Sequence, residues 1–342
     1  MRILLKKISN GKDYDITHLL TKYEWVGSVE KGVRSFSFDV INAPYDKNIM
    51  ELIPPIATGD LISFYTDPDY AVPNYLLFYG QVENMGKKSN KGTISYTCHD
   101  MLIHLTRSET NRTYNETAEA IAMSICTEFG LTPMYIVPTG VSIGKTVFED
   151  KTYFDIISEA YKKAGLSTGK NYYMAMDGIG FYTQEEGKTM LPIKISDGTD
   201  ENKGKGNILS SSFEESMSDL VNRVNVYDSD GKFVTRVEDA ESIAKYGLFE
   251  VNYTVEKDVD INAGANKQLK PIETIIKFEV IGEVNYISGR SVMVHDTATG
   301  LDGEFLIVND SHIWQKGEYI TTLNLKFMGL APTEQKILFQ RS

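Results

Sequence analysis

A strictly alternating segment near the end of the chain constrains the fold most. Between residues 319 and 327 the apolar or aromatic side chains fall on every second position, with Ile320 as the exception. A period of two residues is that of a β-strand with one buried face. An apolar run at 305–308 and a polar bend come before this strand. The segment 303–327 therefore predicts a closing antiparallel strand pair.

The first hundred residues carry the same β pattern. Residues 35–40 alternate cleanly, and further strands are predicted at 61–65, 76–82 and 93–97. Turns rich in Pro, Gly and Asn separate these strands, and strands at this spacing are typical of a small barrel or sandwich. We predict a first β domain, a barrel or a sandwich, over residues 1–107.

The period changes to that of helices after this first β block. One helix presents apolar residues from position 118 onward and ends at Gly130; a second begins at Thr152 and ends at Gly165. Thr152 and Asp155 have the spacing of a capping box. A hairpin turning on Asp177-Gly178 follows, because this dipeptide favours a tight turn. These elements predict an α+β insertion domain over residues 108–195.

A polar, Gly-rich stretch at 191–207 is the best linker candidate, and the β pattern returns after it. Strand signals flank a turn at Asp230-Gly231, and a short helix is predicted around 237–245, ending at Gly247. We predict a second β domain over 196–330 with a short helix, followed by a tail at 331–342. The expected fold class is mainly β with an α+β insertion.

Composition excludes several classes of protein. A length of 342 residues favours two or three domains. The formal net charge of −12 argues against stable nucleic-acid binding, which needs clustered Lys and Arg. Cys98 and Cys126 make no disulfide framework, which favours folding in a reducing cytoplasm. The N-terminal apolar run is too short for a signal peptide, and no run approaches the roughly 18 apolar residues of a membrane span. We expect no membrane insertion by this chain.

Segments that resemble catalytic or nucleotide-binding motifs are better explained by structure. Gly140 and Gly144 precede Lys145, but three residues separate the two glycines where a phosphate-binding loop needs four. In the tripeptide 98–100, Cys98 and His99 would point to opposite faces of a strand, so they could not share a proton. A strand running into a short helix around 101–105 is the better interpretation.

Metal-ion and paired-acid sites are equally weak candidates. The segment Asp228 to Gly231 is better explained by a hairpin turn than by a calcium loop. The five histidines have no zinc-ligand spacing (His18, His99, His104, His295 and His312). The adjacent acids are more typical of a solvated surface than of a glycosidase (Glu185-Glu186 and Glu214-Glu215). The sequence assigns no catalytic, cofactor-binding or metal-binding residue, and it predicts a protein that is not an enzyme.

The order of these blocks, together with certain segments, resembles a known family. The resemblance is strongest at 92–130, with Tyr96, Asp100, Leu105 and IAMSICTEFGL, and at 208–228, ILSSSFEESMSDLVNRVNVYD. The helix closing in Lys245-Tyr246-Gly247 and the final strand pair with His312, Tyr319 and Thr321 add to it. Together they resemble the baseplate hub proteins of contractile phage tails, the XkdQ/YqbQ-like hubs.

The resemblance implies a mechanical function. Such hubs have two similar β-barrel tube-type domains per chain and form homotrimers, which makes a ring of pseudo-sixfold symmetry. The ring joins the hexameric tail tube to the trimeric central spike and forms part of the central channel. The implied partners are the tail tube protein, the central spike protein, other baseplate or wedge and LysM-type adaptor proteins, and the tape measure protein. The implied location is a virion or a phage-tail-like particle, such as a bacteriocin, assembled in the cytoplasm of the bacterial host. No cofactor is implied.

Two other functions stay open on the sequence. One is a tail-associated peptidoglycan hydrolase that uses His99, Asp100 or Glu214. The other is a cell-wall-binding or carbohydrate-binding β module.

Overall fold

The computed structural model describes the chain except for residues 8, 68–73, 89–91, 200–205, 256–260 and 330–342. The predicted tail at 331–342 and part of the predicted linker lie outside the described residues. The chain divides into two compact units. The first unit comprises Met1–Ser211 and Phe278–Ser342, and the second unit is Ser212–Lys277.

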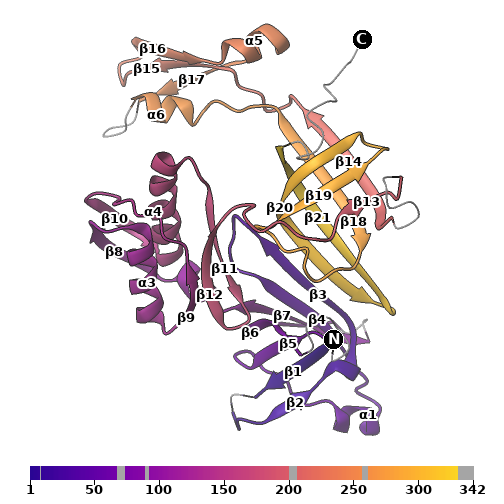
Figure 1. Ribbon diagram of the computed structural model, residues 1–342. Helices are drawn as coiled ribbons and strands as arrows, with labels where there is room; N and C mark the ends of the chain where they lie inside the picture. The colour runs from indigo at the N-terminus through magenta and orange to yellow at the C-terminus, as the bar shows by residue number, and fades with distance from the viewer. Residues whose placement is uncertain (8, 68–73, 89–91, 200–205, 256–260, 330–342) are drawn as a thin grey trace. The chain divides into compact units, whose positions relative to one another are not determined.

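The first β block, residues 1–107, is an antiparallel sheet in the first unit (Figure 1). Its strands follow the order β3-β4-β7-β6-β5-β1-β2. The elements are β1 (Arg2–Lys6), β2 (Asp13–Asp15), η1 (Thr17–Leu19), β3 (Leu20–Ser28), β4 (Ser35–Ile41), α1 (Lys47–Leu52), β5 (Leu61–Tyr65), β6 (Leu76–Lys87), β7 (Thr93–Asp100) and α2 (Ile103–Arg107). Alternation places every second side chain inward, so Phe36, Phe38 and Val40 of β4 are buried in one aromatic-rich core. The four strands predicted here are confirmed, although β6 and β7 run further than expected.

The insertion between residues 108 and 195 packs two helices beside two small sheets. Its elements are β8 (Glu109–Tyr114), α3 (Ala118–Phe129), β9 (Thr132–Ile136), β10 (Thr146–Thr152), α4 (Tyr153–Thr168), β11 (Tyr172–Asp177), β12 (Gly180–Glu185) and β13 (Ile195–Ser196). The sheets are β10-β8 and β11-β12-β9, while β13 pairs with β19 of the second β block. Helices α3 and α4 and strands β11 and β12 share a second hydrophobic core, to which Leu102 and Leu105 at α2 also belong.

Both predicted helices of the insertion are confirmed, and one ends later than expected. The α3 helix ends at Gly130 in the left-handed conformation, with φ of 63°. The predicted capping box begins α4, because the Asp155 amide donates to the Thr152 hydroxyl, which in turn donates to the Asp155 carboxylate. The prediction that α4 ends at Gly165 is wrong, since the helix continues to Thr168 and Gly169 caps it.

Five strands of the second β block belong wholly or in part to the first unit. They are β14 (Ile208–Ser216) and β18 (Glu273–Ile281), which run across the boundary of the two units, and then β19 (Ser291–Asp296), β20 (Leu301–Gln315) and β21 (Glu318–Gly329). The alternating segment is confirmed as β21, with Thr321, Leu323 and Leu325 buried.

The predicted polar bend before β21 is wrong. Residues 309–315 continue strand β20, and the turn is only Lys316 and Gly317, which both have positive φ, 54° and 82°. Two positive φ values are what a type I′ hairpin turn requires. The hairpin predicted on Asp177 and Gly178 also differs slightly, because Asp177 pairs with Gly180 and its loop is Gly178 and Ile179.

One continuous sheet unites the two β blocks. Its path runs β14-β18-β21-β20-β3-β4-β7-β6-β5-β1-β2, with β19 pairing to both β13 and β20. Strand β20 joins the two β blocks, because its first half pairs with β19 and its second half pairs with β3. The predicted fold class, mainly β with an α+β insertion, is confirmed.

The second unit is a small α+β body that the sequence analysis did not separate from the second β block. Its elements are β15 (Arg223–Tyr227), β16 (Phe233–Glu238), α5 (Ala240–Tyr246), β17 (Glu250–Thr254) and α6 (Ile261–Asn266), and its sheet order is β16-β15-β17. The turn at Asp230-Gly231 is confirmed, and so is the helix that ends at Gly247. The domain boundaries 1–107, 108–195 and 196–330 stay a prediction, and residues 212–277 form a compact insertion within the last of them.

Among the described residues, no helix is long and apolar enough to cross a membrane.

Candidate functional site

Strands β3 and β20 form the junction between the two β blocks. They pair antiparallel from Ser28 opposite Asn309 to Lys22 opposite Gln315. Within this ladder Gly27 lies opposite Asp310. The junction therefore places Asp310, a buried acidic residue of the second β block, beside strand β3 of the first β block.

A buried ion pair fixes this junction. Arg34, just before β4, directs its guanidinium at the Asp310 carboxylate, with Nη1 donating to Oδ1 at 3.2 Å and Nη2 donating to Oδ2. The two side chains are 4% and 0% exposed. Burial alone would raise the pKa of Asp310, but the charge of Arg34 and the hydrogen bond from His312 hold it well below its usual range. The bidentate pair therefore stays ionised inside the protein.

The Arg34 side chain crosses the backbone of β3 at a glycine. A Cβ on Gly27 would lie 2.1 Å from Arg34 Nη1, so only glycine leaves room for the guanidinium. Next to it, the Trp25 ring lies 4.0 Å from the Arg34 Cζ atom, which adds a cation–π contact. The Ser288 amide also donates to Asp310 Oδ1 at 2.7 Å. The Trp25 ring therefore fixes the position of the Arg34 guanidinium, and the Ser288 amide fixes that of the Asp310 carboxylate.

His312 extends this polar cluster to the last hairpin. Its Nε2 lies 3.1 Å from the Tyr286 carbonyl oxygen, which can only accept, so Nε2 donates. Its Nδ1 lies 2.8 Å from the Tyr319 hydroxyl and 3.3 Å from the Thr321 hydroxyl. Sequence reasoning missed this cluster because it took residues 309–312 for a polar bend. The available signal was Asp310 and His312 at alternate positions directly after an apolar run.

Asp100 supports the junction from the first β block. Its carboxylate accepts the Arg34 amide at 2.9 Å and the Leu102 amide at 3.0 Å. Burial raises the pKa of Asp100 to about 7, although these two amides and the Arg34 charge lower it. Asp100 therefore positions Arg34 and begins the turn into α2.

The tripeptide at 98–100 forms no catalytic triad in the structure. Cys98 lies in the hydrophobic core, and burial raises the pKa of its thiol. His99 points to the other face of β7, where its Nδ1 pairs with Glu83. The predicted strand running into a short helix is confirmed as β7 and α2.

The other candidate residues are engaged in local structure. The Glu119 carboxylate accepts the Gly140 amide at 3.0 Å, so a protein acid occupies the loop that resembled a phosphate site. Asp228 accepts the Asp230 and Lys232 amides of its hairpin turn, and Glu185 pairs with Lys170 at 2.7 Å. Within the described ranges, no group of three or more His, Cys, Asp or Glu side chains could hold a metal ion.

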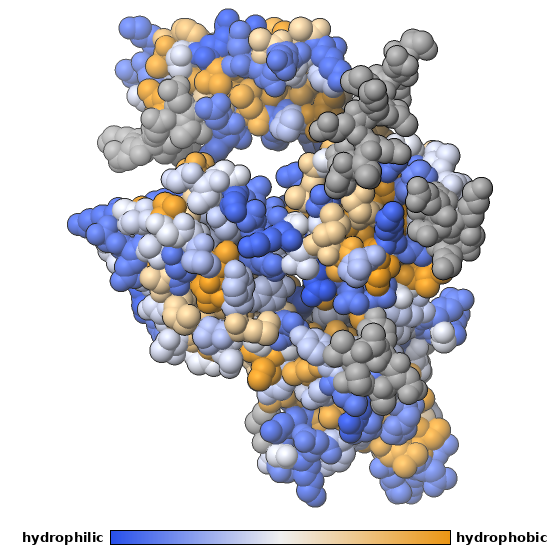
Figure 2. All heavy atoms as spheres, viewed as in Figure 1, coloured by the Kyte–Doolittle hydropathy of each residue, from blue (hydrophilic) through white to orange (hydrophobic). Residues whose placement is uncertain are grey.

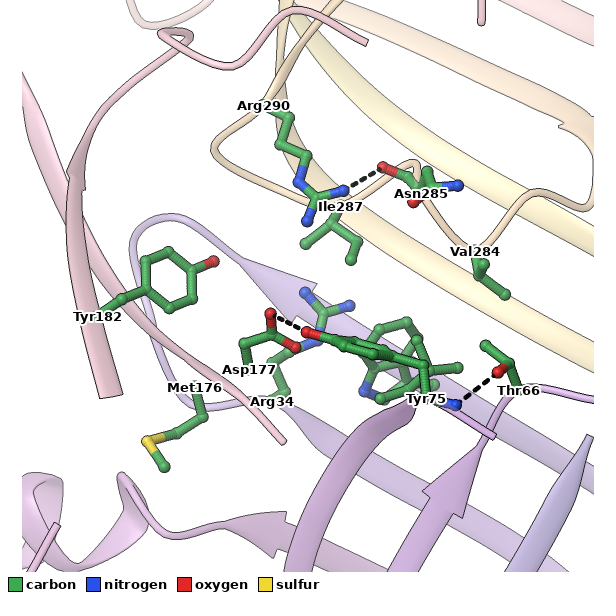
Figure 3. A pocket seen from close by; sticks show the side chains of 12 residues that line it. Arg34, Thr66, Tyr75, Met176, Asp177, Tyr182, Val284, Asn285, Ile287 and Arg290 are labelled. Atoms are coloured by element: carbon green, nitrogen blue, oxygen red, sulfur yellow. Dashed lines mark hydrogen bonds between the residues drawn. The ribbon is translucent and has the colours of Figure 1, made fainter. Parts of the chain in front are cut away.

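A cavity of about 210 Å³ lies beside the junction (Figure 3). It is lined from the first β block, from the insertion and from the second β block, by Trp25, Arg34, Thr66, Tyr75, Leu77, Met176, Asp177, Tyr182, Val284, Asn285, Ile287 and Arg290. The Tyr75 hydroxyl donates to Asp177 Oδ2 at 2.6 Å and so ties the first β block to the insertion (Figure 3). Burial and the neighbouring Asp177 raise the pKa of Tyr75, so the hydroxyl keeps its proton. No local sequence pattern indicates this cavity, because its lining residues are spread from Trp25 to Arg290.

Comparison with known families decides the identity of this fold. The YQBQ-like family matches residues 23–326, which is most of the chain and includes Arg34 and Asp310. The chain belongs to the YQBQ-like family. The resemblance to these hub proteins, inferred from the sequence, is thereby confirmed. None of the curated proteins matches this YQBQ-like chain.

Solved structures of tail proteins share the fold of this YQBQ-like protein over nearly its full length. The 43 kDa tail protein of prophage MuSo2 from Shewanella oneidensis has a TM-score of 0.68 at 16% identity, covering 95% of this chain and 98% of that chain. The tail protein from Neisseria meningitidis has a TM-score of 0.64 at 14% identity, covering 96% and 97%.

A secretion-system protein shows the same fold at greater distance. The c3393 protein of E. coli, a type VI secretion component structurally similar to the T4 bacteriophage tail proteins gp27 and gp5, has a TM-score of 0.50 at 11% identity. The alignment covers 91% of this chain and 74% of that chain.

Proposed function

We propose that this YQBQ-like protein is the structural baseplate hub of a contractile tail, in a phage or a phage-derived bacteriocin. In this proposal three copies form a homotrimer that joins the hexameric tail tube to the trimeric central spike and forms part of the central channel. The observation that carries the proposal is the continuous sheet through β20 and β3. It gives each chain two β blocks in fixed register, and three such chains present six blocks to a sixfold tube.

The buried junction suits a part that transmits force between tube and spike. The Arg34–Asp310 pair and the Asp100 contacts join segments that are far apart in sequence, and the His312 cluster ties them to the last hairpin. A packed interior with few alternative arrangements deforms little, so the two β blocks would move together when the tail contracts. This design supports the proposed structural role.

The proposal also accounts for exposed strand edges and apolar side chains. Strands β14 and β2 end the sheet path, and β14 exposes 54% of Leu209 and 41% of Phe213. Figure 2 shows apolar surface exposed on the visible face of the molecule. Uncovered edges invite pairing with other chains. We propose that neighbouring hub subunits, the tube protein, the spike, the wedge and LysM-type adaptor proteins and the tape measure protein cover such surfaces, after assembly in the host cytoplasm.

Electron cryo-microscopy of the assembled particle tests this proposal. We expect three copies of this chain in one ring, with six β blocks around the channel and a spike bound on one side. The isolated chain can stay monomeric until its partners arrive, so light scattering is measured both alone and with the spike protein. A ring with six copies of the chain, or an arrangement without threefold symmetry, would contradict the proposal.

A further inference from the structure

Two buried hydrogen-bond donors lie near the cavity beside the junction. Trp25 Nε1 and Arg34 Nε are buried, and neither has a partner in the part of the chain that the structure describes. Both residues line the cavity. Buried donors are normally paired. These two atoms are closed to solvent, so the evidence for a ligand comes from the donors that the cavity itself exposes.

Arg290 adds a charged donor group on the opposite wall. Among the described residues its guanidinium makes one hydrogen bond, from Nη1 to the Asn285 carbonyl oxygen at 3.4 Å, and no ion pair. Figure 3 shows this guanidinium directed into the open space between Tyr182 and Ile287. A guanidinium has five N–H donors in a planar fork, so most of its capacity is unused.

The two carboxylates at or next to the cavity are already engaged. Asp177 accepts the Tyr75 hydroxyl, and Asp310 neutralises Arg34 from outside the cavity lining. Among the described lining residues Asp177 is the one carboxylate, and it makes no ion pair with Arg290. An added acceptor with negative charge would complete the hydrogen bonding of Arg290.

The volume and the lining of the cavity indicate which apolar group would fit beside such an acceptor. Its volume of about 210 Å³ exceeds the roughly 150 Å³ of an engineered cavity that binds benzene. The aromatic rings of Trp25, Tyr75 and Tyr182 and the apolar Leu77 and Ile287 form its walls. Tyr75 is 41% exposed, so the cavity opens to solvent on its side.

We propose that this cavity binds a carboxylate attached to a ring-sized apolar body, with Arg290 holding the charge. The guanidinium pairs with the carboxylate in a two-pronged contact, and the apolar body packs against the aromatic walls. Two sources share this chemistry: a free aromatic acid, and the C-terminal carboxylate of an aromatic residue in a partner chain. The site is separate from the hub function, which could fail while this site binds, or the reverse.

Intrinsic fluorescence of the full-length protein provides the test. The chain has two tryptophans, so Trp314→Phe leaves Trp25 of the cavity as the single reporter. Titration with benzoate should give a saturable change, and the neutral isostere benzamide should bind at least tenfold more weakly. In the same background Arg290→Gln should weaken benzoate binding at least tenfold. The exposed Arg2→Gln is the matched control and should bind benzoate unchanged.

A peptide pair distinguishes the two sources. A short peptide ending in Phe with a free C-terminus is compared with the same peptide amidated. Tighter binding of the free peptide than of benzoate identifies a chain terminus as the ligand, while binding of benzoate alone identifies a small acid. Absence of saturable binding by both carboxylates overturns the proposal, and so does an unchanged affinity in a folded Arg290→Gln variant.

A crystal soak keeps the proposal falsifiable if the Arg290 variant does not fold. Wild-type crystals soaked with 4-bromobenzoate should show anomalous bromine density inside the cavity and the carboxylate at Arg290. Density for ordered water alone would mean that water satisfies the Arg290 guanidinium, which also overturns the proposal.

Discussion

At the scale of single residues, the Arg34–Asp310 pair dominates the energetics of the junction. Asp310→Ala leaves the Arg34 charge buried without a partner, and we expect a loss of about 3–5 kcal/mol in the free energy of unfolding. Chemical denaturation measures this value. The control is Glu159→Ala, which breaks the Lys151–Glu159 pair, whose side chains are 42% and 40% exposed. That change should cost about 1 kcal/mol or less. Equal effects of the two variants would show that the buried pair has no special importance.

The pH dependence of stability tests the environment of Asp100. Its pKa is raised from 3.8 to about 7, so between these values the folded protein binds more protons than the unfolded chain. Stability contributed by Asp100 is therefore present at low pH and is lost as the pH rises to about 7. The pKa of Asp310 shifts the opposite way, so Asp310 titrates below this window.

The measurement compares wild type with Asp100→Asn from pH 4 to pH 8 by denaturant titration. We expect the stability of the wild type relative to the variant to fall as the pH rises, and to level off above about pH 7. The same pH dependence in both proteins would contradict the raised pKa.

At the scale of elements, the interior glycine of α4 reverses a general rule. Replacing a helix glycine by alanine usually stabilises by about 1 kcal/mol. A Cβ on Gly165, however, would lie 2.5 Å from the Lys170 carbonyl oxygen, where the chain turns into β11. Overpacking of this kind costs about 1–3 kcal/mol, so we expect Gly165→Ala to destabilise the protein.

The control for this prediction lies in the same turn of α4. Ser167 is exposed, and Ser167→Ala should stabilise by about 0.5 kcal/mol or less. Thermal unfolding of the two variants gives the sign of each effect. A more stable Gly165→Ala protein would mean that the helix and the following strand have room to separate.

At the scale of the whole molecule, the acidic charge bears on the proposed channel. A net charge of −12 repels nucleic acid, which suits a wall that DNA passes without binding. We expect no retardation of double-stranded DNA by the purified protein in gel-shift experiments at about 150 mM salt. A basic DNA-binding protein of similar mass is the positive control. Retardation that weakens with added salt would reveal a basic surface and contradict this expectation.

The sequence by itself determined the elements whose signals are local. The period of residues 319–327 predicted β21, the Thr152–Asp155 pair predicted the start of α4, and Gly130 predicted the end of α3. These signals depend on neighbours within one or two turns of chain. Composition and a few family-specific segments were enough to indicate the fold class and the family.

Only the tertiary structure decided where the polar residues of β20 lie and how the two β blocks join. Asp310 is a core residue because Arg34, which lies 276 positions away in sequence, supplies the opposite charge. Gly27 is required by the guanidinium that crosses it, and Gly165 by the carbonyl of Lys170. The compact unit at 212–277 also has no local boundary signal that the sequence analysis recognised. Each of these features depends on contacts between distant residues, and the energy of such contacts cannot be assigned until the fold brings the partners together.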